Sequence, residues 1–151
     1  MKRFVGGAML FLLAACAPPR TQGPPVIRYG RNVCSHCGMI VSEARYASGY
    51  IDPTGKSVIF DDLGEIFIEI NGHSDLLARA YVNDVEATAW IPAKDAFYVR
   101  VAGLATPMGY GISAYRDQAR ASAFARNRKG VEGPFSLDMA SRLFSRDTVL
   151  K

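Results

Sequence analysis

The sequence predicts an α+β fold, in which two small ββαβ-type units lie in tandem and pack as one compact module. The chain has 151 residues, which is enough for one compact domain. Its content of 49% hydrophobic and 21% charged residues is typical of globular proteins. From residue 31 onward, short strand patterns alternate with helical patterns. We expect the first unit over residues 31–84 and the second over residues 85–151.

The first unit is predicted to contain two strands, a helix and a third strand. The turn sequence DPTG at residues 52–55 separates the first two strands, as in a β-hairpin. Asp62 and Glu65 have the spacing of a capping box at a helix start. Residues 66–70 fit a helix by their apolar spacing, although they also fit a strand. The predicted ranges are strands at 45–51, 56–60 and 80–83, and a helix that opens at 61–62 and stops at 71–72.

The second unit repeats this order with negligible sequence identity to the first. Strands are predicted over residues 87–91 and 96–101. A turn rich in proline and glycine follows, and then a helix over residues 113–127. Residues 137–145 predict a short terminal helix, in which the apolar pattern assigns Met139 to the core.

The first sixteen residues resemble a bacterial lipoprotein signal. Lys2 and Arg3 precede an uncharged apolar run that is too short to span a membrane and fits the core of a signal peptide. The run ends in Leu-Ala-Ala before Cys16, as in a lipobox. We therefore expect removal of residues 1–15 and lipidation of Cys16. The alternative is an ordinary signal peptide that is cleaved nearby, in which case Cys16 is not a lipidation site.

Residues 16–30 predict a tether, because they contain four prolines and two glycines with little periodicity. We expect a lipid-anchored domain on the periplasmic side of the cell envelope, where unpaired thiols tend to oxidise. Ala17, in place of Asp after the lipidated cysteine, predicts the outer membrane. Removal of the signal leaves 16 basic and 14 acidic residues, a net charge of +2. So small a charge gives no electrostatic reason to expect nucleic-acid binding.

Two short segments carry the candidate chemistry, and the first is CSHCGM at residues 34–39. A C-x-x-C pair can form a disulfide, a redox dithiol or half of a metal site. Here Met39 follows Cys37 across Gly38, and thiolate and thioether sulfur are soft donors that together favour Cu(I). The glycine allows a backbone turn that lets both sulfurs face one ion.

The second segment is TPMGYG at residues 106–111, which follows a predicted strand. It places Met108 in a tight turn and not in an amphipathic stripe. Core packing is the common role of a methionine, but it is less expected in a turn rich in proline and glycine. Met108 is therefore a second candidate thioether ligand.

Two other chemistries remain open from the residues alone. Cys34, His36, Cys37 and the distant His73 offer zinc ligands, but a second C-x-x-C or H-x-x-H pair is missing. A redox dithiol formed by the two cysteines would be expected after a strand, whereas here a tether precedes the pair. The competing classes are therefore a Cu(I) metallochaperone, an envelope thiol–disulfide oxidoreductase and a structural zinc-binding lipoprotein.

Three motifs together resemble the nitrous-oxide reductase accessory lipoproteins, the NosL family. They are CxxCGM at residues 34–39, FDDLG at 60–64 and TPMG at 106–109, and they occur in the family's order and at similar spacing. The resemblance covers residues 32–135 and the lipobox. Each motif alone is weak, and the three together are specific.

This resemblance implies a membrane-anchored periplasmic copper chaperone, not an enzyme, that binds Cu(I). It implies delivery of copper for assembly of the copper sites of nitrous-oxide reductase. The implied partners are a membrane-transporter accessory protein of the maturation machinery and the reductase itself. The implied fold is two ββαβ units related to organomercurial lyase. The implied copper ligands are Cys37, Met39 and Met108, with Cys34 and His36 as further candidates.

Overall fold

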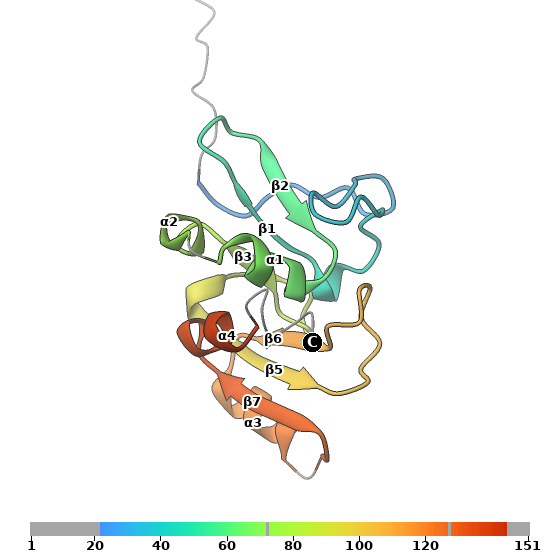
Figure 1. The fold of residues 1–151 in the computed structure, drawn as a ribbon, viewed down its shortest axis with the longest axis vertical. Coiled ribbons are helices and arrows are strands. Elements are labelled where there is room, and N and C mark those ends of the chain that lie inside the picture. Colours follow the sequence, from blue (N-terminus) through green and yellow to red (C-terminus); the bar gives the residue numbers. More distant parts are fainter. Residues whose placement is uncertain (1–21, 72, 127, 145–151) are drawn as a thin grey trace, which may run out of the picture.

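The computed structural model describes residues 22–71, 73–126 and 128–144, and they form a mixed α/β fold with two antiparallel sheets (Figure 1). The predicted signal peptide and Cys16 lie outside the described residues. Among the residues that are described, no helix has the length and apolarity needed to cross a membrane.

The first sheet has the strand order β2-β1-β3-β4 and contains the predicted hairpin. The Asp52 carboxylate accepts hydrogen bonds from the N–H groups of Thr54 and Lys56, which closes the turn between β1 and β2. The strand alternative for residues 66–70 is wrong, because most of that segment lies in a helix. The elements are a 3₁₀ helix (Ala44–Tyr46), β1 (Ser48–Ile51), β2 (Ser57–Phe60), α1 (Leu63–Glu69), α2 (Ser74–Leu77), β3 (Tyr81–Asn83) and β4 (Trp90–Pro92).

The second sheet has the strand order β6-β5-β7, with a helix between its last two strands in sequence. Each sheet is thus built around a ββαβ unit, β1-β2-α1-β3 in the first and β5-β6-α3-β7 in the second. The two-unit order is as the sequence predicts, but the second unit uses other strands than expected, and no strand is predicted at β7. The remaining elements are a 3₁₀ helix (Ala93–Asp95), β5 (Phe97–Val101), β6 (Ile112–Tyr115), α3 (Gln118–Ala125), β7 (Val131–Phe135) and α4 (Leu137–Leu143).

Two predicted elements of the second unit differ from the structure. Residues 113–115 belong to a strand and not to the helix, because they pair with β5, and the helix begins only after Asp117. The strand predicted at residues 87–91 is observed at β4, and it pairs with β3 in the first sheet. Both errors have one cause, since strand pairing is decided by distant segments that local periodicity does not report.

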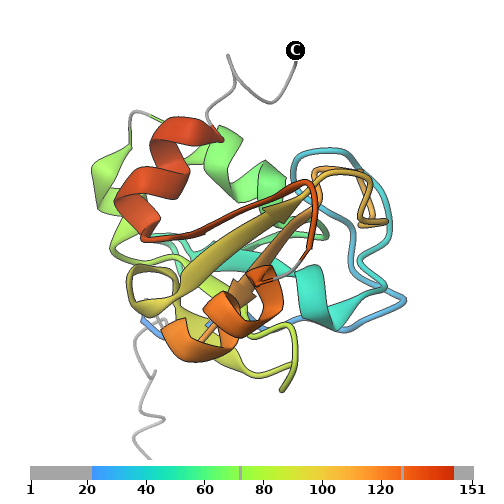
Figure 2. The ribbon, with the colours of Figure 1, turned by 90° about the horizontal axis from the view of Figure 1, so that it is seen from below.

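The two units share one hydrophobic core. Phe67 of α1 makes edge-on contacts with Tyr98 of β5, at 5.2 Å between ring centroids, and with Phe144, at 5.5 Å. In Figure 2, α4 lies beside α1, and Ala140 of α4 and Phe144, the residue directly after it, are buried in the core. The core assignment of Met139 is wrong, because its side chain is 47% exposed.

The last nine residues of the predicted tether segment, 22–30, lie against the domain. Pro25 is buried, and a Cβ atom at Gly49 would come within 3.1 Å of its Cγ. The N–H of Val26 donates a hydrogen bond to Ser57 Oγ, and Ile27 packs against the core. The described fold therefore begins nine residues before the first predicted unit.

Candidate metal centre

The cysteines lie in a tight loop on the free edge of the first sheet. The N–H of Cys34 donates to the carbonyl of Met39 at 2.7 Å, and the N–H of Gly38 donates to the carbonyl of Cys34 at 3.2 Å. Gly38 has φ +77°, a left-handed conformation that favours glycine. Ser35 fixes the loop to β2, because its N–H and Oγ both bond the backbone of Ile59.

The loop points its two thiols at the start of α1. Cys34 Sγ lies 3.0 Å from Glu65 Oε2, and Cys37 Sγ lies 3.5 Å from Asp61 Oδ1. One ligand atom from each of these four residues lies within 4.8 Å of the others, so the group could hold a metal ion. Both cysteines are free thiols, Cys34 buried and Cys37 half-buried.

Burial controls the protonation of this cluster. It raises the pKa of both thiols, and the neighbouring Glu65 carboxyl raises that of Cys37 further. Burial likewise raises the pKa of Glu65, whose Oε1 has no hydrogen-bond partner among the described residues. The metal-free thiols therefore hold their protons at neutral pH, and a bound metal must displace them.

The second loop, between β5 and β6, is attached to the same helix start. Asp62 caps α1 by accepting a hydrogen bond from the N–H of Gly64 through Oδ1 at 3.1 Å. Its Oδ2 accepts bonds from Thr106 Oγ1 at 2.5 Å and from the N–H of Met108 at 2.9 Å. Asp62 is fully buried, so one carboxylate joins the TPMG turn to the CxxC side of the molecule.

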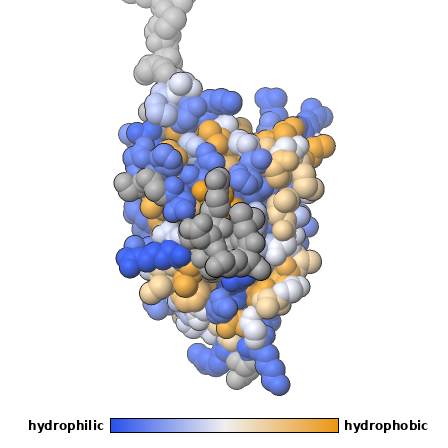
Figure 3. All heavy atoms as spheres, viewed as in Figure 1, coloured by the Kyte–Doolittle hydropathy of each residue, from blue (hydrophilic) through white to orange (hydrophobic). Residues whose placement is uncertain are grey.

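The two loops lie on one side of the molecule, at the right in both ribbon views (Figures 1 and 2). In the space-filling view, many residues along that side have intermediate to high hydropathy, shown in pale colours and orange (Figure 3). Met39 is 50% exposed and Met108 is 38% exposed. The two methionines are thus exposed on the two loops, whereas Cys34 is buried and Cys37 is half-buried.

The structure separates the predicted site residues into three groups. Cys34 and Cys37 meet at the carboxylates, and Met39 and Met108 lie on the two neighbouring loops. His36 is exposed, and within the described residues its imidazole makes no hydrogen bond, although its N–H donates to Cys34 Sγ at 3.4 Å. His73, the distant zinc candidate, lies at the start of α2.

Sequence reasoning missed the carboxylates at the thiols. The capping-box interpretation of Asp62 and Glu65 is confirmed, but it accounts for only one of the two oxygens on each residue. A helix cap needs only one aspartate. The second aspartate, Asp61, within the apolar segment FDDLGEIF was therefore the available sign of an additional role for a carboxylate at this position. The role of Asp61 depends on its burial next to Cys37 in the folded protein, which the spacing of residues in the sequence does not reveal.

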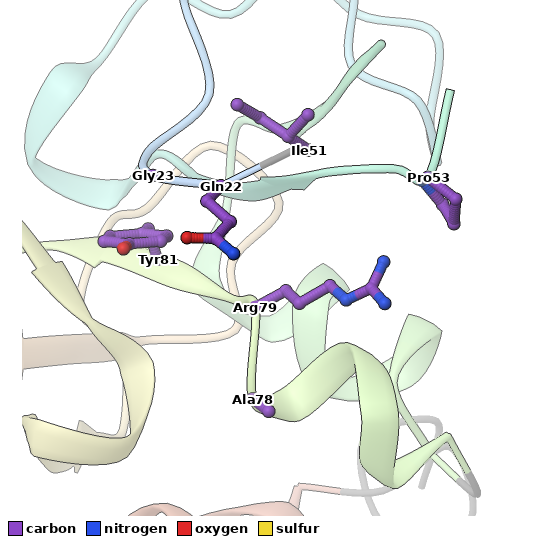
Figure 4. Close-up of a pocket in the computed structure, with 7 residues that line it drawn as sticks. All are labelled: Gln22, Gly23, Ile51, Pro53, Ala78, Arg79 and Tyr81. Atoms are coloured by element: carbon purple, nitrogen blue, oxygen red, sulfur yellow. The ribbon is translucent and has the colours of Figure 1, made fainter. Parts of the chain in front are cut away.

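A separate cavity of about 450 Å³ is open to solvent near the beginning of the described chain (Figure 4). It contains no cysteine, methionine or histidine and is not part of the candidate centre. Its lining residues are Gln22, Gly23, Ile51, Pro53, Ala78, Arg79 and Tyr81.

Fold and site together define a small mixed α/β protein in which two thiols meet two carboxylates at a helix start of the first unit, and a loop of the second unit is anchored beside them. The family model for NosL matches residues 26–136, and the chain belongs to the NosL family. The crystal structure of the copper chaperone NosL from Shewanella denitrificans is similar, with a TM-score of 0.58 and 18% sequence identity. The match covers 76% of this chain and 93% of that chain, and at this identity it shows the fold. No curated relative matches the chain.

Proposed function

We propose that this protein is a Cu(I)-binding metallochaperone, a carrier and not an enzyme. The observation that carries the proposal is that Asp62 and the start of α1 bring the CxxCGM loop and the TPMG turn to one place. The proposed ligands are Cys37, Met39 and Met108. Sulfur donors of this kind favour Cu(I) over harder divalent ions. Cys34 and His36 are further donors on the same loop.

The exposure of the two methionines supports a carrier. A soft, incomplete coordination shell at the surface lets the ligand of an acceptor protein enter before the original ligands leave. Copper is therefore the cargo, and it passes from this protein to the acceptor by ligand exchange. Because the proposed ligands come from both units, the affinity for Cu(I) also depends on the relative position of the two loops.

The pKa directions argue against a thiol–disulfide oxidoreductase. Reactive dithiols usually contain a cysteine whose pKa is lowered by a helix start or a nearby cation. Here burial and the Glu65 carboxyl raise the pKa of Cys37, so little thiolate is present without a metal.

One observation favours zinc as a second candidate ion. Cys34, Cys37, Asp61 and Glu65 supply two sulfurs and two carboxylates within 4.8 Å, a donor set that suits Zn(II). This set leaves both exposed methionines unused. Parallel titrations with Cu(I) and Zn(II) separate the two candidates.

The proposal extends to location and partner. Lipidation at Cys16 would hold the protein on the periplasmic side of the envelope, at the outer membrane. The cargo would go to the copper sites of nitrous-oxide reductase, through a membrane-transporter accessory protein or directly. Family membership and the lipobox support this assignment.

Competition between the reduced protein and a chromophoric Cu(I) chelator tests the proposed site. We expect one Cu(I) per chain, and Cys37→Ser or Met108→Leu should weaken binding by about tenfold or more, equivalent to about 1.4 kcal/mol. The matched control is Met139→Leu, because Met139 is similarly exposed on α4. Unchanged affinity in Met108→Leu contradicts the two-loop site, and tight Zn(II) binding without a preference for Cu(I) favours the zinc alternative.

Cell fractionation tests the proposed anchor. Wild-type protein should be found with the outer membrane and carry a lipid on Cys16, detectable by mass spectrometry. Cys16→Ser should release the protein from the membrane fraction or leave its precursor unprocessed. Retention of a processed Cys16→Ser protein at the membrane contradicts lipid anchoring.

A further inference from the structure

Asp62 is the buried side chain that joins the two ligand-bearing loops. It belongs to the first unit, where it caps α1, while Thr106 and Met108 belong to the second. Its two oxygens accept from three donors: the N–H of Gly64, the hydroxyl of Thr106 and the N–H of Met108. Helix capping alone uses only Oδ1.

We propose that Asp62 is a positioning residue that holds the Met108 thioether at the metal site. The inference rests on the proposed function and adds a residue with no direct contact to the ion. Met108 is an exposed residue in a loop that contains glycine and proline, so its position depends on backbone anchors. The hydrogen bond from its own N–H to Asp62 is the anchor closest to its side chain.

Burial makes this anchor effective. Asp62 is 0% exposed, so water does not compete for its oxygens, and hydrogen bonds to a charged acceptor are stronger than neutral ones. Thr106 extends the network, because its Oγ1 also accepts from the N–H of Gly111 at 3.2 Å. The carboxylate thus binds Thr106 and Met108 directly and is linked to Gly111 through the Thr106 hydroxyl.

Asp62→Asn separates anchoring from helix capping. Asparagine caps helices as well as aspartate does, so its single side-chain oxygen can still accept from Gly64. The side-chain NH₂ then faces Thr106 Oγ1 and the N–H of Met108, where the N–H is left without an acceptor. Thr106→Val removes one donor from the same network, and Thr106→Ser restores the hydroxyl.

Asp84 provides a matched control. It is also a buried aspartate, and it accepts from the N–H groups of Glu86, Ala87 and Arg116 and from neither ligand loop. Asp84→Asn should therefore reduce thermal stability without changing Cu(I) affinity.

A double-mutant cycle on the full chain in a Cys16→Ser background tests the proposal by Cu(I) competition. We expect Asp62→Asn to weaken Cu(I) binding by about tenfold, but by no more than Met108→Leu does. In the Met108→Leu background the same change should have no further effect. Thr106→Val should act in the same direction, and Thr106→Ser should recover the affinity. X-ray absorption should show one sulfur fewer around copper in Asp62→Asn.

The outcomes distinguish this inference from the proposed function. If Met108→Leu weakens binding while Asp62→Asn does not, the positioning role is wrong and the two-loop site remains. If Asp62→Asn weakens binding equally in both backgrounds, its effect is general destabilisation and the positioning role is again wrong. If Met108→Leu has no effect, both the two-loop site and the positioning role are overturned.

Discussion

Glu65 is buried at the centre of the candidate site. Its Oε2 accepts bonds from the Cys34 thiol at 3.0 Å and from the N–H of Asp62 at 3.4 Å, while Oε1 has no partner among the described residues. Burial penalises the charged carboxylate and raises the pKa of Glu65 above its ordinary value of 4.5. The carboxyl therefore keeps its proton to a higher pH in the metal-free fold than in the unfolded chain.

This raised pKa predicts that Glu65→Gln stabilises the metal-free protein at neutral pH. Below pH 4.5 Glu65 is protonated in both folded and unfolded chains, so its contribution to stability is fully present. As pH rises from 4.5 through the folded pKa, ionisation favours the unfolded chain by up to about 1.4 kcal/mol per pH unit. In urea unfolding at pH 4, 5.5 and 7, the free energy of unfolding of Glu65→Gln should exceed that of the wild type by an amount that grows with pH. A difference independent of pH contradicts the ionisation argument.

At the scale of elements, α1 organises the site. Its capping residue anchors the Met108 turn, and its first turn supplies Glu65 to the thiols. Gly64 in that turn allows close packing, because a Cβ atom there would overlap the ring of Tyr110 from the second unit. The helix start therefore requires a glycine for contact between units, although its φ is not left-handed.

Gly64→Ala should lower the free energy of unfolding by about 1–3 kcal/mol, because the added methyl group displaces Tyr110. It should also weaken Cu(I) binding, since Tyr110 lies two residues after Met108. In a Tyr110→Gly background, which removes both the ring and the Cβ atom that a Gly64 methyl group would meet, the same substitution should be neutral or stabilising, because alanine favours a helix over glycine by about 1 kcal/mol. Denaturant unfolding of the four proteins measures this sign reversal, and equal effects in both backgrounds contradict it.

At the scale of the whole molecule, the two segments that carry the proposed ligands contain no charged side chain. Residues 32–42 and 101–115 contain no lysine, arginine, aspartate or glutamate, in a chain with 21% charged residues. Within the described part of the chain, four of the seven exposed large hydrophobic residues lie on these loops. They are Val33, Met39, Ile40 and Met108.

If an acceptor docks on these two segments, copper transfer should depend little on salt. Surface charges steer association at rates that fall steeply with ionic strength, and these segments carry no charged side chain. With nitrous-oxide reductase as the acceptor, as proposed above, the rate of Cu(I) transfer to its copper-free form in the presence of the proposed accessory protein should change by less than about twofold between 20 and 500 mM NaCl. Ile40→Lys should make the rate salt-dependent. A steep salt dependence of the wild-type rate contradicts apolar docking.

Local signals in the sequence predicted the parts of the fold that local interactions determine. The DPTG turn and the capping box gave the hairpin and α1, and the CxxCGM spacing gave the cysteine loop. Strand β6 was mistaken for helix because its pairing with β5 is non-local. Met139 was assigned to the core although Ala140 of α4 and Phe144, directly after it, are buried instead. Asp61 and Glu65 were missed at the site because tertiary burial brings them to the thiols.

The packing of residues 22–30 against the domain restricts how far the carrier can travel. Only residues 17–21 separate Cys16 from the first described residue, and their covalent length is at most about 20 Å. With a lipid on Cys16 as proposed, the metal-bearing face stays within roughly one domain diameter of the bilayer. An acceptor must then come to the membrane to collect its copper, so encounters take place in a thin layer instead of the full periplasmic volume.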